Sequence, residues 1–153
     1  MEQCVSHYPA TRSGSLPDCY AVLAAFRADD SDRQVVHYVL RCARVLARLH
    51  RIRLVRAESD RVDERRTELV DAVDHWIRTH VPAPPRACAP DIRPGVAVDQ
   101  LAAAYVHAES VLNAEHTRDE LHHAWSRVGY LAAQWSDLVT AVVQGQPAPP
   151  RTV

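Results

Sequence analysis

Apolar residues recur along the chain at the three- and four-residue spacing of amphipathic helices, interrupted by polar or proline-rich segments. The predicted segments are a short helix at 16–28, a hairpin of two long helices at 33–80, a Pro-rich linker at 81–95, a second hairpin at 96–144 and a tail at 145–153. Within the hairpins, the pattern predicts helices at 33–54, 60–80, 96–116 and 118–144. The chain is therefore expected to be all-α.

The two predicted hairpins resemble each other in sequence. The stretch RQVVHYVLRCARVLARLH at 33–50 aligns without a gap on DQLAAAYVHAESVLNAEH at 99–116, and this alignment pairs Gln34 with Gln100 and His50 with His116. Such an internal repeat predicts a four-helix bundle built from two helical hairpins, with a short additional N-terminal helix. We expect residues 1–153 to form a single domain of this kind.

Composition excludes several kinds of function. All 18 basic residues are arginine, which rules out lysine chemistry, and 4 glycines are too few for a dinucleotide or phosphate-binding loop. The net charge of −1 argues against nucleic acid as a partner. The 4 cysteines lack CxxC spacing, and no apolar run suits a signal peptide or a membrane span. The sequence thus predicts a cytoplasmic protein with reduced thiols, no cofactor and no membrane partner.

The candidate chemistry comes from polar residues that lie inside the apolar arcs of the predicted helices. His50, Arg66, Glu109 and His116 are of this kind, and a charge buried there needs a compensating partner. In an up-down-up-down bundle these four residues are expected near one end, with Glu109 about 10 Å deeper by the helical rise. His122, His123 and Trp125 should enter the same end from the last helix.

A cluster of this composition can form an acid–base pocket for a small organic molecule. We assign catalytic roles to His50, Glu109 and His116; the expected substrate-binding residues are Arg66, Tyr105, His122 and Trp125. Cyclisation, isomerisation or dehydration would suit these groups. Asp74 and Asp99 are expected at the opposite end, where capping and surface pairing explain them.

Structural interpretations remain open beside this hypothesis. Each histidine taken singly is explained by a place near a helix end, and Arg66 with Glu109 by an ion pair that sets register. The stripe of Arg41, Arg44, Arg48 and Arg51 fits a solvated face. On this view the protein is a non-catalytic helical interaction module, with a second copy of itself as partner.

Two further alternatives, a di-iron site and an RNA-directed nuclease, have less support in the sequence. Glu120 and His123 have the ExxH spacing of di-iron bundles, but the sequence offers no second ExxH, so no metal is expected. The stretch RDELHH at 118–123 is similar to the Arg-x4-His motif of HEPN ribonucleases, which would make the protein an RNA-directed nuclease. The arginine and histidine fall on different sides of the helix, which argues against that activity.

Several stretches in order resemble an uncharacterised bacterial family, domain-of-unknown-function family 4254, in its actinobacterial form. They are LPDCYAVLAAFRA, LARLHRIRL, RRTELVDAVDHW, GVAVDQLA and LHHAWSRVGYLAAQWSDLV, which together span most of residues 16–142. The resemblance implies a helical bundle with no established activity. It also implies family-like positions for His50, Arg66, Asp74, Asp99, His122 and Trp125, without assigning roles. With the predicted pocket, it suggests a place in actinobacterial specialised metabolism.

Overall fold

The computed structural model describes residues 15–29, 37–56, 59–81 and 93–144. These residues form no strand and five helices: α1 (Cys19–Arg27), α2 (Tyr38–Val55), α3 (Asp60–His80), α4 (Pro94–Leu112) and α5 (Arg118–Gln144). The all-α class is confirmed for this part of the chain. The predicted tail, most of the linker and the first residues predicted for the first long helix lie outside the described residues.

One difference from the predicted bounds is at the end of α4, which stops at Leu112 rather than at residue 116. A capping box explains the early stop. The Thr117 hydroxyl accepts from the Glu120 amide at 3.2 Å, and the Glu120 carboxylate accepts from the Thr117 amide at 2.7 Å. Because Thr117 forms the capping box at the start of α5, the residues before it form the turn between α4 and α5. His116 therefore lies in this turn and not on a core-facing helical stripe, which corrects the prediction.

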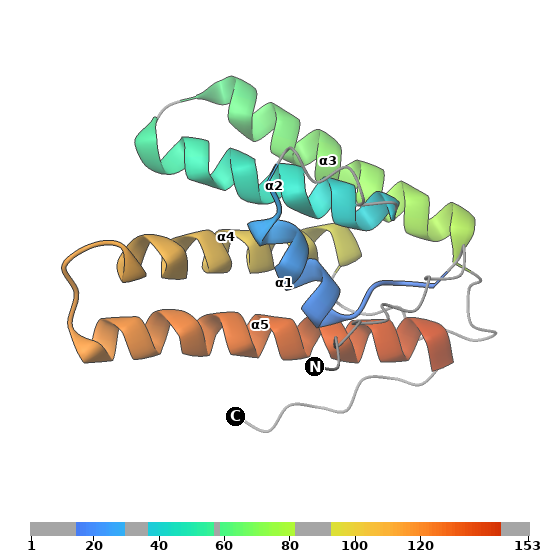
Figure 1. The fold of residues 1–153 in the computed structure, drawn as a ribbon. Coiled ribbons are helices and arrows are strands. Elements are labelled where there is room, and N and C mark those ends of the chain that lie inside the picture. The colour runs from blue at the N-terminus through green and yellow to red at the C-terminus, as the bar shows by residue number, and fades with distance from the viewer. Residues whose placement is uncertain (1–14, 30–36, 57–58, 82–92, 145–153) are drawn as a thin grey trace, which may run out of the picture.

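Helix α4 occupies the centre of the fold (Figure 1). The α2–α3 hairpin packs on one side of α4, α5 packs on another side, and α1 lies across α2, α4 and α5. Within the described residues, α5 makes no contact with α2 or α3. The four-helix-bundle topology is thus not confirmed, since α4 separates α5 from the first hairpin.

The sequence of α4 suits this central position because it is rich in alanine and has little bulk. Ten of its residues are buried, among them the aspartate Asp99. Gly95, in the first turn, allows α4 to approach α3 closely: a Cβ at this position would lie 2.2 Å from the carbonyl oxygen of Val70. The same turn is capped by α3, since Asp74 accepts from the Gly95 amide at 2.7 Å.

The segment before α1 is tied to two other helices. The indole of Trp135, on α5, donates to the carbonyl of Pro17 at 2.9 Å. His37, the N-cap of α2, accepts from the Val39 amide through Nδ1 at 3.2 Å and donates from Nε2 to the carbonyl of Ser15 at 2.9 Å. Because Nδ1 must accept, these contacts need the neutral imidazole with its proton on Nε2.

We predict opposite effects for alanine at two glycines. Gly95→Ala should lower the free energy of unfolding by about 1–3 kcal/mol or more, because the new methyl group forces α4 away from α3. Gly129→Ala, where nothing lies within 4 Å of the added Cβ, should instead gain up to about 1 kcal/mol from helix propensity. Urea denaturation followed by circular dichroism measures both. Equal effects of the two substitutions would contradict the close packing at Gly95.

Protonation of His37 should lower the stability of the protein in mild acid. Burial lowers the pKa of His37 below its ordinary value, although the hydrogen bond to Ser15 opposes this shift. The contribution of His37 is therefore fully present above about pH 6.5 and is lost as the pH falls towards the folded-state pKa. Melting temperatures between pH 7.5 and 5.5 should fall less in His37→Ser, which keeps a capping side chain. Parallel losses in the two proteins would contradict this role.

Candidate functional site

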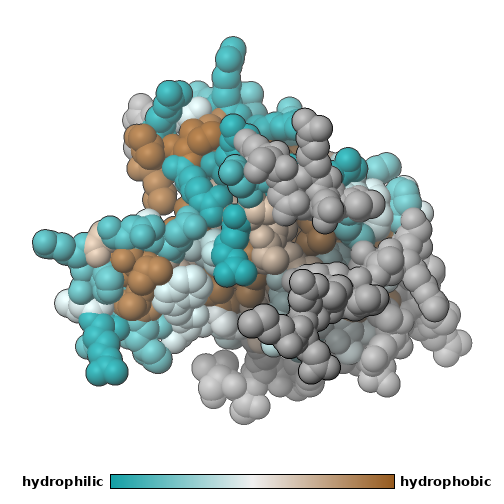
Figure 2. Space-filling model, in the orientation of Figure 1, coloured by the Kyte–Doolittle hydropathy of each residue, from teal (hydrophilic) through white to brown (hydrophobic). Residues whose placement is uncertain are grey.

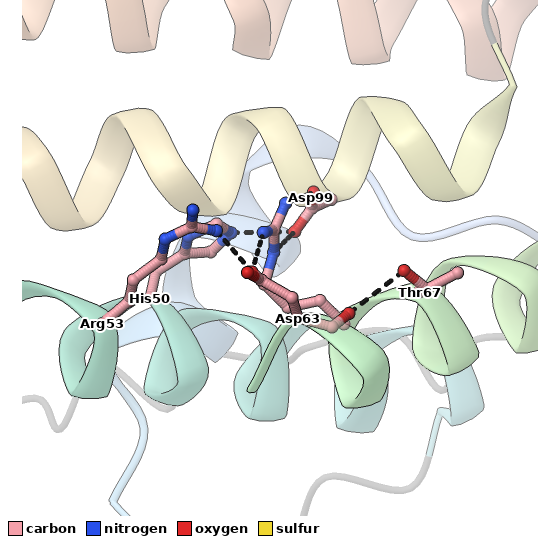
Figure 3. A network of polar contacts seen from close by, with 6 residues as sticks. His50, Arg53, Asp63, Thr67 and Asp99 are labelled. Atoms are coloured by element: carbon pink, nitrogen blue, oxygen red, sulfur yellow. Dashed lines mark hydrogen bonds and ion pairs between the residues drawn. The ribbon is translucent and has the colours of Figure 1, made fainter. Parts of the chain in front are cut away.

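Three helices each contribute one side chain to a partly buried polar group of residues, the Asp99 cluster, which consists of His50, Arg66 and Asp99. His50 on α2 lies with Nε2 2.8 Å from Oδ1 of Asp99 on α4. Arg66 on α3 donates from Nη2 to Oδ2 at 2.8 Å and from Nε to Oδ1 at 3.2 Å. Figure 3 shows His50 and Asp99 approaching each other from neighbouring helices. The carboxylate therefore holds α2, α3 and α4 together.

The surroundings of Asp99 keep it ionised. Burial raises the pKa of this carboxyl group, but the hydrogen bonds from His50 and Arg66 and their positive charge together hold its pKa below the ordinary value. In turn, the hydrogen bond that Arg66 donates to Asp99 raises the pKa of Arg66. The cluster thus contains a carboxylate–guanidinium ion pair, with the imidazole of His50 bound to the same carboxylate.

This geometry fixes the tautomer of His50. An ionised carboxylate can only accept hydrogen bonds, so Nε2 must carry a proton and donate it to Asp99. Within the described residues, the other ring nitrogen, Nδ1, has no hydrogen bond. His50 also lines an open hollow of about 310 Å³ together with Arg53, Leu54, Ala103, Val106 and His107. An oriented imidazole with a spare nitrogen at the wall of a hollow is the arrangement expected of an acid–base group.

A second carboxylate extends the cluster towards the surface. Asp63 accepts from Nη1 of Arg66 at 2.9 Å and is also ion-paired with Arg53. Its backbone carbonyl accepts from the hydroxyl of Thr67 at 3.0 Å. Figure 3 shows Arg53 and Asp63 beside His50, from α2 and α3 respectively. Asp63 thus connects the arginine that lines the hollow to the arginine that holds Asp99.

Glu109 lies away from the Asp99 cluster. Its two oxygens accept from Nε and Nη2 of Arg51 at 2.8 and 3.2 Å, and Nη2 also donates to the carbonyl of Phe26 at 2.8 Å. Arg51 is therefore a link between α1, α2 and α4, and its assignment to a solvated face is wrong. Sequence periodicity could not show this because α1 covers part of the face opposite the core.

The aromatic residues predicted for the site, Tyr105 and Trp125, do not lie in the hollow at His50. The ring of Tyr105 lies 5.5 Å from that of Phe26 and 5.8 Å from that of Trp125, measured between centroids. Burial, followed by the charge of Glu109, raises the pKa of Tyr105. Tyr105 therefore packs against α1 and Trp125 packs against Tyr105, and neither lines the hollow at His50.

His116 and His122 lie nearer the surface. Nδ1 of His116 is 2.7 Å from the carbonyl of Ala114 in the α4–α5 turn, and this histidine lines a separate hollow of about 730 Å³ between α4 and α5. His122 is exposed on α5, and His123 contacts the backbone of its own helix at Asp119. The larger hollow also contains Glu115, Glu120 and Arg127.

The structure therefore brings together two of the four polar residues predicted to share one cavity. His50 and Arg66 meet on Asp99, whereas Glu109 and His116 belong to other surroundings. Asp99 was expected at the opposite end of the bundle, and this placement was wrong. His50 meets residue 99, whereas residue 109 is bound by the next residue of α2, Arg51. Asp74 caps α4 as expected, but from a buried position.

Comparisons with known proteins add no identification. No protein family, no characterised protein and no solved structure matches the chain. No helix in the described part of the chain is long and apolar enough to cross a membrane. The same residues contain no group of three or more side chains placed to hold a metal ion.

Asp99 should be the residue on which the packing of α2 and α3 against α4 most depends. Asp99→Ala leaves His50 without its acceptor and Arg66 with Asp63 alone in a largely buried place, so the free energy of unfolding should fall by about 3 kcal/mol. His116→Ala, in the exposed turn, should leave it unchanged. Urea denaturation of both variants tests this. A loss at Asp99 no larger than that at His116 would show that the cluster is not a stabilising element.

Proposed function

We propose that this protein binds a small organic molecule in the hollow at His50 and exchanges a proton with it. One observation carries the proposal: the His50 imidazole is oriented by a buried, ionised Asp99 through Nε2, and it lines the hollow. Asp99 fixes the orientation of the ring, as a carboxylate does beside a histidine that acts as a general base. Arg66 keeps Asp99 in place and does not line the hollow.

The class of reaction follows from the groups around the hollow. A histidine can remove or return a proton, while Leu54 and Val106 provide an apolar surface for the rest of the molecule. These groups suit an isomerisation, cyclisation or dehydration that proceeds by proton transfer. We further propose that the chain is an actinobacterial member of domain-of-unknown-function family 4254 and that its two hairpins form a variant of a helical bundle. The sequence stretches that resemble this family support the proposed membership.

A screen for binding tests the proposed site. A library of small neutral and charged organic compounds is added to ¹⁵N-labelled protein, and amide shifts are followed. Binders should move the amides of Leu54, Ala103, Val106 and His107, and the Nδ1 resonance of His50 should shift with them. His50→Gln, which keeps an N–H donor for Asp99, should weaken binding without unfolding the protein, and His116→Gln is the matched control. Shifts confined to the larger α4–α5 hollow would contradict the proposal.

A non-catalytic interaction module is the second candidate, and one observation favours it. At the end of α2, Leu54 is 57% exposed and Val55 is 85% exposed, which is unusual for such large apolar side chains. Figure 2 shows hydrophobic surface at the end of the molecule where α2 passes into α3. Sedimentation velocity at increasing protein concentration separates the candidates, because an interaction module that pairs with itself should become dimeric.

A further inference from the structure

The described residues that line the hollow at His50 carry positive and apolar groups but no carboxylate. Arg53 supplies a guanidinium, His50 and His107 supply imidazoles, and the remaining surface comes from Leu54, Ala103 and Val106. The two acidic groups of the network, Asp63 and Asp99, do not line this hollow and pair with Arg53, Arg66 and His50. The wall is therefore complementary to an anion with an apolar body.

Arg53 can exchange its present partner for a ligand. The Arg53–Asp63 pair is about half exposed, at 46% and 48% of the two side chains, so water already screens it. Asp63 is also held by Arg66 at 2.9 Å. If Arg53 turns to a bound anion, Asp63 keeps one guanidinium and no buried charge is left unpaired.

We infer that the ligand of this hollow is a small organic carboxylate. The planar guanidinium of Arg53 can bind a carboxylate through two parallel hydrogen bonds, as arginine commonly does. Leu54 and Val106 then contact the apolar body of the ligand, and His50 lies beside it. The hollow, at about 310 Å³, is at the small end of the range of ligand pockets, about 300–1,000 Å³. This inference rests on the proposed function and adds the chemical class of the ligand.

Three compounds of nearly the same shape test the charge requirement: phenylacetate, phenylacetamide and 2-phenylethylamine. Titration of ¹⁵N-labelled protein at pH 7.5 should give shifts at Leu54, Ala103, Val106 and His107 with phenylacetate. The dissociation constant for phenylacetate should be about tenfold lower than that for the neutral amide, the effect of one favourable ionic contact of about 1.4 kcal/mol. The amine should be the weakest binder.

Two variants should change this affinity in opposite directions. Arg53→Gln removes the positive charge and should weaken phenylacetate binding to the level of the amide. Asp63→Asn removes the carboxylate that competes for Arg53 and should tighten binding about threefold, by the free energy typical of an exposed ion pair. Glu64→Gln makes the same charge change at an exposed neighbouring position on α3, and Arg61→Gln is the matched control for Arg53; neither should alter the affinity.

The possible results separate this inference from the proposed function. If phenylacetamide binds the hollow as tightly as phenylacetate, or if Arg53→Gln has no effect, the carboxylate inference is overturned, while a ligand site at His50 stands. If Asp63→Asn and Arg53→Gln both weaken binding while thermal melts show folded protein, Arg53 and Asp63 act as a structural pair and the inference is again overturned. If none of the three compounds shifts these amides, the inference fails, and the library screen alone decides the proposed function.

Discussion

Asp99 places an ionised carboxylate inside the protein, and the positions of α2 and α3 against α4 depend on how that charge is compensated. Water cannot do so, because the side chain is only 12% exposed. The partners come from two different helices: His50 from α2 and Arg66 from α3. Since each residue along a helix turns by about 100°, a slip of one residue in either helix would carry its donor away from Asp99. An unpaired charge would then remain in the interior, so the cluster selects one register.

The location of the candidate site follows from the sides of α4 that other helices cover. Asp74 from α3 caps the first turn of α4, and Asp99 faces α2 and α3. On the side that carries Tyr105 and Glu109, α1 supplies Phe26 and α2 supplies Arg51. Ala103 and His107 border both the hollow between α2 and α4 and the hollow between α4 and α5. The open surface is thus the part of the central helix that its neighbours leave uncovered.

Much of the helical pattern could be predicted from the sequence, because apolar periodicity and prolines determine where helices form. The polar residues on apolar arcs were also informative: desolvation requires partners for His50 and Arg66, and both have one. The identity of that partner was missed. Asp99 flanks its apolar stripe, and periodicity does not show which helix packs beside it. The up-down-up-down geometry assumed a common axis, whereas α4 separates α5 from α2 and α3. Glu109 and His116 were therefore assigned to the wrong neighbours.

The contacts that hold the helices together use only one of the two ring nitrogens of His50, Nε2. Both oxygens of Asp99 are satisfied by Nε2 of His50 and by Nε and Nη2 of Arg66, which leaves Nδ1 outside the contacts that hold the helices. A glutamine could supply one N–H donor to a carboxylate, but it has no nitrogen that titrates near neutral pH. Because the bond to Asp99 uses Nε2 alone, the position of α2 against α4 does not depend on Nδ1. The cluster thus combines a fixed architecture with one ring nitrogen that the contacts between the helices do not use.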